Sequence, residues 1–430
     1  MTHHDAFEPV RNVGGIEEHR HRGNGLAVLL LAAAAAPVAA FQVTYRVGSR
    51  NEGAGLTGAT HLLEHLMFKG TERFNRGRGT SVFETLQTVG AQVNATTWYD
   101  RTNYYALLPA EHLPLAIEIE ADRMRGALVS EADVASERNV VLNELDRGEN
   151  EPMRRLLHAV YAVAFLAHPY GHPVIGWRGD VETVTAGDLR GFYDAHYWPS
   201  NATACVVGSF DPAEALGLVD RHFGGIAAAP AGATRDAATR EPAQLGERKV
   251  IVRQAGQLGT VLLAYKAPAG LDPAADALDV LASLLGAGKS SRLYRALTDA
   301  GLATGASAFY PRLRDPGLFA AYATLAPDVE SARVEDVLRD TLRSVAAEGV
   351  TEKELARARR RVIAAEAFGR DGPMAVVGQL NEAIAVGDWT LYPTARARVE
   401  AVSAEDVREG AQALFDDDRL TVGHYVPTRS

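Results

Sequence analysis

The chain has 430 residues and a formal net charge of −10, because 44 Lys and Arg residues are outnumbered by 54 Asp and Glu residues. Hydrophobic residues make up 47% and charged residues 23%, ordinary globular values that exclude a disordered chain. The length predicts two to three domains, and the acidic balance argues against a nucleic-acid-binding protein. One cysteine, Cys205, excludes an intrachain disulfide and a cysteine-based zinc knuckle. We therefore expect a cytoplasmic protein, with a periplasmic location as the alternative.

Residues 26–41 (LAVLLLAAAAAPVAAF) follow a polar lead-in and allow two interpretations. The run resembles the apolar core of a secretory signal, but the segment before it is long and contains acidic residues. The run is also too short to span a bilayer, and Pro37 interrupts it. We predict a strand, a turn near Ala36 and Pro37, and a second strand at 41–47, with an export signal as the alternative.

The next feature along the chain is the motif His61-Leu62-Leu63-Glu64-His65. Two His residues four apart lie on one face of a helix, and Thr57 and Gly70 are suited to begin and end that helix. Two imidazoles and a carboxyl among apolar neighbours need partners, and a metal bound through both imidazoles provides one. Zinc suits two imidazoles plus one carboxylate, with Glu64 placed to take a proton from water. The alternative is a pair of core histidines with hydrogen-bond partners.

The two halves of the chain repeat each other. Residues 181–190 (VETVTAGDLR) return as 399–408 (VEAVSAEDVR), each with Thr or Ser three residues before an Asp, which predicts a capped helix start. The segment between the halves is rich in Ala, Gly, Pro and Thr, as linkers are. We expect a first domain at 1–226, a linker at 227–246 and a second domain at 247–430. The alternative is chance similarity between amphipathic helices.

Each half is predicted to contain strands, a helix, more strands, further helices and a last strand, at 203–208 in the first half and 420–425 in the second. Strands and helices alternate irregularly, which favours a mixed sheet with helices packed on it over a doubly wound parallel sheet. The expected fold class is therefore α+β, with two homologous αβ-roll domains that arose by duplication.

A third metal ligand is available downstream of the histidines. Glu137 and Glu144 are seven residues apart, so they lie two turns along one face of a predicted helix. Two acids on an ordinary helix are equally well explained as solvent-exposed side chains that bind no metal. The repeat favours the ligand interpretation, because the matching positions in the second half are Ala358 and Ala365, and that half has no HxxEH motif.

These residues resemble a known family. The HxxEH motif, the following Phe68-Lys69-Gly70-Thr71, and the pair Glu137 and Glu144 resemble inverted-motif zinc metallopeptidases of the pitrilysin, insulysin and mitochondrial processing peptidase type. The chain is similar to the short two-domain bacterial form. The resemblance continues through residues 93–104 (VNATTWYDRTNY), covers nearly the whole chain and is closer in the first half.

The resemblance implies one zinc ion per chain. His61, His65 and Glu144 would bind the ion, and Glu64 would be the general base. Glu137 would not bind the ion directly but would support the site from outside the set of ligands. Together these residues would make up the catalytic and metal-binding set.

The resemblance also implies how a peptide is held. Asn94, Ala95 and Thr96 would lie on an edge strand to which a peptide adds as a further strand, inside a closed chamber. The implied function is that of a zinc-dependent endopeptidase. The alternative is a non-catalytic or assembly subunit of a related peptidase complex.

The second half departs from the family pattern. Close relatives carry an Arg and a Tyr that assist the oxyanion, and this chain has Thr298 and Thr304 at those positions. We expect a homologous subunit to supply the Arg and Tyr pair in a heterodimer. The alternative is a homodimer that uses Arg292 or Tyr294, or the metal alone. No nucleic-acid partner and no membrane span are expected.

Two further features were assigned no function. The segment Gly286-Ala287-Gly288-Lys289-Ser290-Ser291 resembles a phosphate-binding loop, but it lacks the first glycine and follows a helix rather than a strand. The basic run at 357–361 (RARRR) is interpreted as a solvated helix face.

Overall fold

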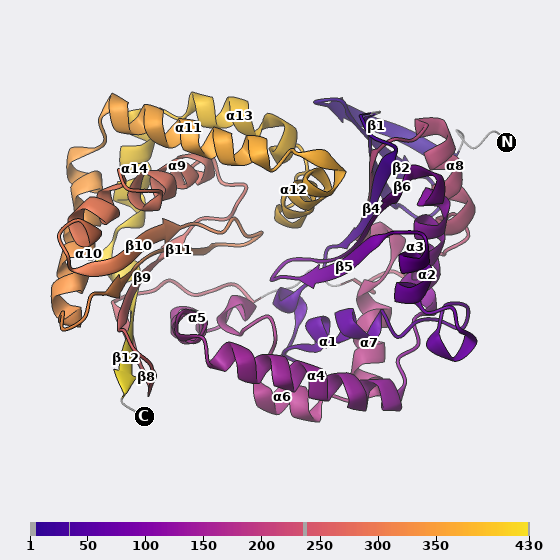
Figure 1. Ribbon diagram of the computed structural model, residues 1–430, viewed down its shortest axis with the longest axis horizontal. Coiled ribbons are helices and arrows are strands. Elements are labelled where there is room, and N and C mark those ends of the chain that lie inside the picture. Colours follow the sequence, from indigo (N-terminus) through magenta and orange to yellow (C-terminus); the bar gives the residue numbers. More distant parts are fainter. Residues whose placement is uncertain (1–5, 34, 235–238, 429–430) are drawn as a thin grey trace. The chain divides into compact units, whose positions relative to one another are not determined.

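The computed structural model describes residues 6–33, 35–234 and 239–428 (Figure 1). The chain forms two compact units, each assembled from three segments: the first from Met1–Leu145, Pro173–Ala238 and Gly369–Pro393, the second from Asp146–His172, Thr239–Phe368 and Thr394–Ser430. The chain passes from the first unit to the second within the linker expected at 227–246. Unlike the expected domains 1–226 and 247–430, each unit also takes one segment from the opposite half.

The first unit is built on a seven-stranded mixed sheet of order β1-β2-β3-β7-β4-β6-β5. Its strands are β1 (Phe7–Val13), β2 (Ile16–His21), β3 (Ala27–Ala32), β4 (Val38–Tyr45), β5 (Gln92–Thr97), β6 (Thr102–Pro109) and β7 (Ala202–Gly208). The two strands predicted around Pro37 are confirmed as β3 and β4. They form no hairpin, because β7 lies between them, parallel to β3 and antiparallel to β4. The expected polar lead-in is instead the hairpin of β1 and β2.

The second unit contains a five-stranded mixed sheet of order β10-β11-β9-β12-β8. Its strands are β8 (Arg248–Ala255), β9 (Thr260–Ala267), β10 (Ala303–Phe309), β11 (Gly317–Leu325) and β12 (Leu420–Thr428). Here β12 is inserted between β8 and β9, parallel to β8 and antiparallel to β9, as β7 is inserted between β3 and β4. The order β3-β7-β4-β6-β5 within the first sheet recurs in the second as β8-β12-β9-β11-β10, which confirms the expected α+β fold with two homologous halves.

Helices cover both faces of the first sheet (Figure 1). The helices of this unit are α1 (Ala59–Leu66), α2 (Val82–Thr88), α3 (Leu113–Gly126), α4 (Glu131–Glu149, whose last turn belongs to the second unit), α6 (Arg178–Thr183), α7 (Ala186–His196), α8 (Pro212–Phe223) and α12 (Gly372–Val386). Helix α12 comes from the second half of the sequence. It is anchored on β4, where Gln42 Nε2 donates to the Val377 carbonyl at 3.1 Å and Thr44 Oγ1 donates to Asn381 Oδ1 at 2.8 Å.

The second sheet is covered in the same way. Its helices are α5 (Pro152–Ala164), α9 (Ala275–Gly286), α10 (Ser331–Glu348), α11 (Glu352–Phe368), α13 (Leu391–Ala401, which begins in the first unit) and α14 (Ala404–Leu414). Helix α5, from the first half of the sequence, packs on β12 and β8. A Cβ at Gly423 of β12 would lie 2.4 Å from Val160 Cγ2 of α5, so this contact requires glycine.

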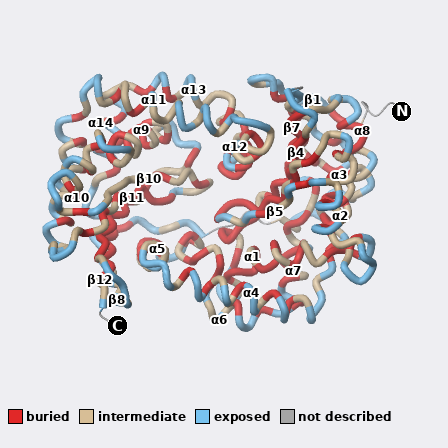
Figure 2. Tube along the Cα trace, viewed as in Figure 1, coloured by how far each residue is buried: buried red, intermediate tan, exposed pale blue. Residues whose placement is uncertain are grey.

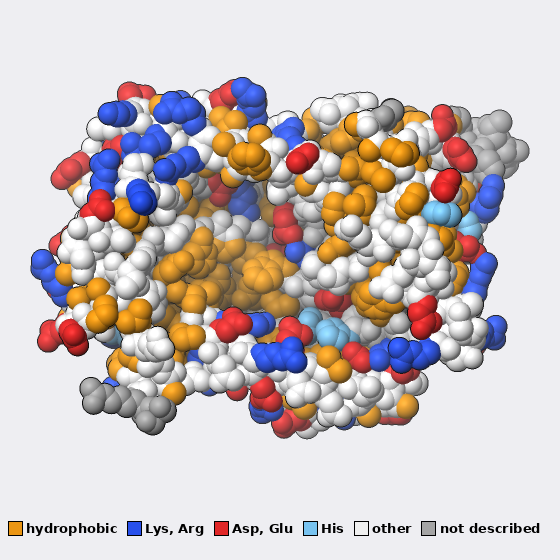
Figure 3. Space-filling view, in the orientation of Figure 1, with side chains coloured by type: hydrophobic (Ala, Val, Ile, Leu, Met, Phe, Trp, Pro, Cys, Tyr) orange, Lys and Arg blue, Asp and Glu red, His pale blue; other side chains and the backbone are white. Residues whose placement is uncertain are grey.

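Burial follows this layered plan. The central strands and the helix faces turned toward them are buried, whereas the outward helix faces are exposed (Figure 2). Charged side chains are spread over the surface that faces the viewer in Figure 3. The capped helix starts predicted from the repeat are confirmed: Thr185 with Asp188, and Ser403 with Asp406, form reciprocal capping boxes. Within the described residues, no helix has the length and apolar character needed to cross a membrane.

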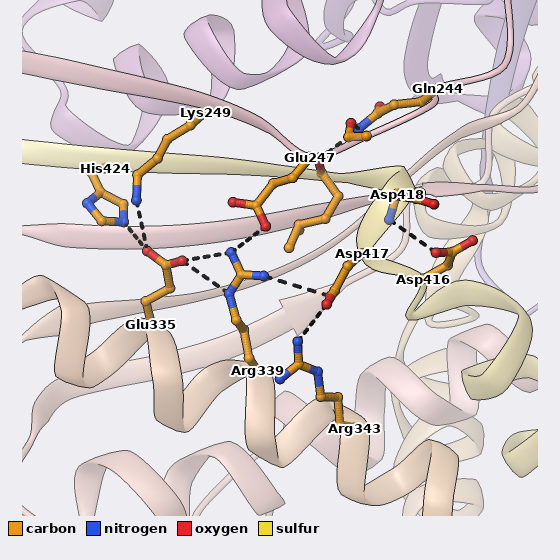
Figure 4. A network of polar contacts seen from close by, with 12 residues as sticks. Gln244, Glu247, Lys249, Glu335, Arg339, Arg343, Asp416, Asp417, Asp418 and His424 are labelled. Atoms are coloured by element: carbon orange, nitrogen blue, oxygen red, sulfur yellow. Dashed lines mark hydrogen bonds and ion pairs between the residues drawn. The ribbon is translucent and has the colours of Figure 1, made fainter.

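A network of polar contacts connects α10 to β12 and to the edge strand β8 of the second sheet (Figure 4). The Glu335 carboxylate lies 2.6 Å from His424 Nε2, 3.3 Å from Lys249 Nζ and 2.7 Å from Arg339 Nη2. Arg339 also pairs with Glu247 at 2.8 Å. The hydrogen bond with His424 is the main reason that the pKa of Glu335 is lowered from 4.5 to about 2, with Arg339 and Lys249 adding to it against the effect of burial. Glu335 is therefore held as a carboxylate.

Candidate metal centre

Helix α1 begins at a buried carboxylate. Gly58 precedes the helix with φ of 88°, and its N–H and that of Thr60 donate to Glu52 at 2.8 and 2.7 Å. Glu52, and not the predicted Thr57, therefore satisfies the helix start, because Thr57 Oγ1 donates to Asp180 at 2.7 Å. Burial raises the pKa of Glu52 to about 8, against the hydrogen bonds from Thr60 and Gly58.

The two histidines project from one face of α1, as their spacing predicts. Their ring centroids are 4.8 Å apart, with 70° between the ring planes. The opposite face of the helix carries Leu62, Leu63 and Leu66, all completely buried. The apolar face thus fixes α1 in the core and leaves His61 and His65 at a partly exposed surface.

Helix α4 brings both predicted acids to the histidines. Glu144 Oε2 lies 3.7 Å from His61 Nε2, and Glu137 Oε2 lies 3.1 Å from His65 Nδ1. Between the acids, Val141 is completely buried and holds α4 against the core, whereas Val140 is 46% exposed. Of these two valines, only Val141 therefore packs against the core.

Glu137 orients His65 rather than joining the cluster of ligand atoms. A carboxylate only accepts hydrogen bonds, so Nδ1 of His65 carries the proton and leaves the Nε2 lone pair available for a metal. Lys69 Nζ lies 2.5 Å from the other carboxylate oxygen of Glu137. Burial raises the pKa of Glu137, but the hydrogen bonds from Lys69 and His65 outweigh it and the pKa is lowered overall.

The residues of this cluster fit zinc. One potential ligand atom from each of His61, His65 and Glu144 lies within 4.8 Å of the others, so one ion can contact all three. Two imidazoles and one carboxylate with a free fourth position is the donor set of catalytic zinc sites. In the part of the chain that the structure describes, this is the one group of three or more His, Cys, Asp or Glu side chains so arranged.

Glu64 lies on the same helix and is held from another element. Glu64 as a residue is 9% exposed, and its carboxyl group accepts a hydrogen bond from Thr97 Oγ1 at 2.5 Å. Burial raises the pKa of Glu64, opposed by the hydrogen bond from Thr97 and by the charge of His65. Sequence reasoning missed Thr97. Its position directly after the Asn94 to Thr96 segment was the available signal, but no spacing rule connects it to Glu64.

The predicted substrate segment lies at a sheet edge. Asn94, Ala95 and Thr96 belong to β5 and pair antiparallel with residues 103–105 of β6. Strand β5 ends the sheet, so no further strand of the described residues pairs with its outer side. Asn94 and Thr96 are exposed and Ala95 is buried. The placement on an edge strand is confirmed, and a role in peptide binding is a proposal.

The two positions at which the family resemblance implies oxyanion donors lie in the second unit. Thr304 is on β10, where its hydroxyl donates to the Thr324 carbonyl, and Thr298 ends a π-helical turn. Arg292, the nearby arginine, is held by Glu354 through two hydrogen bonds of 2.9 and 3.1 Å. Its guanidinium is therefore already bound within its own unit.

Comparison with known families places this site in context. Residues 27–177 match the family profile described as "Insulinase (Peptidase family M16)", and residues 183–362 match "Peptidase M16 inactive domain". The metal-ligand cluster lies in the segment matched by the first profile, and the second half, with Ala358 and Ala365, lacks it.

Relatives agree with that assignment. The chain is 32% identical over 392 residues to an uncharacterized zinc protease of Streptomyces coelicolor, covering 88% of this chain and 82% of the relative. It is 32% identical over 316 residues to the zinc protease PqqE of Helicobacter pylori, covering 73% and 70%. It is 26% identical over 428 residues to the mitochondrial-processing peptidase subunit beta of Lentinula edodes, covering 96% and 91%.

Solved structures share the whole architecture. The crystal structure of a protease from Helicobacter pylori matches with a TM-score of 0.89 at 27% identity, covering 98% of this chain and 99% of that one. A putative M16-like peptidase from Alicyclobacillus acidocaldarius shares the fold, with a TM-score of 0.83 at 20% identity. Fold and site thus define a two-domain protein of the metallopeptidase class. The chain belongs to peptidase family M16, the insulinase family.

Proposed function

We propose that this protein is a zinc-dependent endopeptidase with one zinc ion per chain, bound by His61, His65 and Glu144. The observation that supports it most is the convergence of the three ligand atoms, with Glu64 beside them and hydrogen-bonded to Thr97. The names of its relatives, zinc proteases among them, agree with a peptidase.

In this proposal, residues of the chain itself carry out the proton transfers and orient the groups involved. A zinc ion at the site supplies a Lewis acid that activates water and polarises a carbonyl at neutral pH. Glu64, the general base, takes a proton from water and returns it to the leaving nitrogen. The hydrogen bond from Thr97 fixes the carboxylate for both transfers. Glu137 keeps the His65 ring in the orientation and tautomer that a metal ligand requires.

The peptide is held as an additional strand on β5. The outer edge of β5 is unpaired within the described residues, and the last residue of the strand, Thr97, contacts Glu64. A backbone added along this edge therefore passes directly beside the proposed base. Asn94, Ala95 and Thr96 are the proposed contact residues, and the closed chamber expected from the family resemblance is part of the same proposal.

We further propose a homologous partner subunit that supplies an Arg and a Tyr for the oxyanion. Thr298 and Thr304 occupy the corresponding positions here, and Arg292 is committed to Glu354. The name of one relative, a processing peptidase subunit, is compatible with such an assembly. A homodimer that relies on the metal alone is the alternative arrangement.

The decisive experiment combines metal analysis with Glu64→Gln. The purified wild-type protein should contain zinc and cleave peptides. Glu64→Gln should keep the zinc, because the ligands remain, and lose about 10²–10⁴-fold in turnover as expected for a general base. Near-normal turnover by the variant would contradict the assignment of Glu64 as the general base. Wild-type protein that neither retains zinc nor cleaves peptides would support a non-catalytic subunit instead.

A further inference from the structure

A loop and a basic helix face contact each other in the second unit. Neither belongs to the proposed peptidase site. The glycine-containing loop at 286–291 follows α9, and helix α11 carries the basic run at 357–361. Neither feature indicates a function by itself. The structure packs α11 against α9 and so brings two of the arginines onto the loop.

Both arginines contact the same residue of the loop, Ser290. Arg357 Nη2 donates to the Ser290 carbonyl at 3.1 Å, and Arg361 Nη2 lies 3.4 Å from Ser290 Oγ as a donor. The two arginines are four residues apart and therefore share one helix face. Gly288 has φ of +72°, and a Cβ there would lie 2.6 Å from Arg361 Nη2. Glycine at this position lets the guanidinium lie directly over the loop backbone.

Among the described residues, no carboxylate forms an ion pair with Arg357, Arg361 or Lys289 of the loop. The neighbouring Arg292 differs, since Glu354 neutralises it. Positively charged side chains gather over α11 and its surroundings (Figure 3). Two guanidinium groups thus contact one loop, and the exposed Lys289 of that loop adds a third positive charge next to Ser290. Like charges gathered at one loop repel one another, and a bound anion would relieve that repulsion.

We propose that this cluster, formed by Arg357, Arg361, Lys289 and Ser290, is a binding site for a phosphate-type oxyanion. Guanidinium groups match the geometry of phosphate oxygens through paired N–H donors, and lysine adds a mobile point charge. The Ser290 hydroxyl supplies a further donor. The ligand is inorganic phosphate or the phosphate group of a small ester. The site requires no nucleotide and is independent of the metal cluster.

The test is calorimetric titration of the full-length protein with inorganic phosphate, pyrophosphate and glycerol 3-phosphate, against chloride at the same ionic strength. Wild-type protein should bind phosphate. Arg357→Gln and Arg361→Gln should each weaken binding by about tenfold or more, because each removes a charge-assisted hydrogen bond. Arg360→Gln is the matched control: this arginine lies on the same helix, is exposed and has the same charge. It should bind like wild type.

Several outcomes would overturn the site. They are no phosphate binding by the wild type, equal weakening by Arg360→Gln and Arg361→Gln, or loss of binding in Glu144→Ala with full binding in Arg361→Gln. The second result means a diffuse charge effect, and the third places the anion at the metal. Circular dichroism verifies that each variant is folded, and Arg361→Lys, which keeps the charge, should retain part of the affinity. Tighter binding of glycerol 3-phosphate than of inorganic phosphate would identify an ester as the ligand, and the reverse would identify free phosphate.

Discussion

At the scale of single residues, the contact between Thr97 and Glu64 connects β5, the strand proposed to bind the peptide, to the proposed base. Thr97→Val removes the hydroxyl and keeps the shape of the side chain. We expect kcat to fall by roughly 10-fold or more with little change in KM, since a hydrogen bond to a charged group contributes about 1.5–3 kcal/mol. Steady-state kinetics measures both constants.

Two controls separate positioning from folding in this experiment. Thr97→Ser keeps the hydroxyl and should restore most of the activity, and the zinc content of Thr97→Val should equal that of the wild type. A raised KM with unchanged kcat would mean that Thr97 contributes to peptide binding and leaves the base unaffected.

The two acids of α4 are predicted to differ in their effect on metal. Glu144→Ala should lose the zinc, because two imidazoles alone bind it weakly, whereas Glu137→Ala should weaken affinity by about 10–100-fold. Competition with a chromophoric chelator measures both affinities. Glu131→Ala, at the exposed start of the same helix, is the control and should bind as the wild type does. Wild-type zinc content in Glu144→Ala would mean that the third ligand lies elsewhere.

At the scale of elements, the Glu335 network attaches α10 to the edge of the second sheet (Figure 4). The pKa of Glu335 is about 2 in the folded protein against an ordinary value of 4.5. A lowered carboxyl pKa contributes stability above about pH 4.5, and this contribution is lost as the pH falls from 4.5 toward 2. Acid should therefore loosen this attachment.

Glu335→Gln should lower the free energy of unfolding at neutral pH by roughly 1–2 kcal/mol, a value reduced for partial solvent screening. The difference from wild type should shrink as the pH falls from 4.5 toward 2. Denaturant titrations at several pH values measure it. Glu348→Gln, at the exposed end of α10, is the control. A difference that stays constant between neutral pH and pH 2 would contradict the role of the carboxylate.

Strand β5 gives a prediction that concerns backbone atoms. A peptide added to a sheet edge uses the N–H of every second residue, because successive residues point to alternate sides. N-methylation of a cleaved peptide should therefore raise KM strongly at alternate positions and weakly at the positions between. A KM that is insensitive to backbone methylation, or equally sensitive at every position, would exclude binding as an added strand on β5.

At the scale of the whole molecule, the two halves share the order of five strands and differ in the chemistry of their side chains. The first half carries the metal-ligand cluster, and the second has Thr298 and Thr304 where the oxyanion donors are expected. Peptide cleavage by the purified chain should therefore rise by about 10²–10³-fold when a homologous subunit that supplies Arg and Tyr is added. Titrating the subunit and measuring initial rates tests this. Full activity of the lone chain, unchanged by the partner, would contradict complementation.

The sequence by itself determined which candidate ligands share a helix face, because helix periodicity is local: spacings of four and seven residues place His61 with His65 and Glu137 with Glu144 on single faces. The choice of Glu144 as the third ligand came from the family resemblance. The duplication and the strands around Pro37 were also predictable, since both depend on patterns within short segments. Only the tertiary structure decided which elements meet. The insertion of β7 between β3 and β4 and the transfer of α12 to the first unit depend on contacts between segments far apart in the chain.

The same reason explains the partners of the site residues. Glu52 at the start of α1 and Thr97 at Glu64 leave no periodic signal, because each contact joins two elements whose separation in sequence is arbitrary. The sequence predicts a solvated helix face for Arg357 and Arg361, and packing places both against the loop of Ser290. Local patterns thus determined which chemical groups share a face, and long-range packing decided which faces come together.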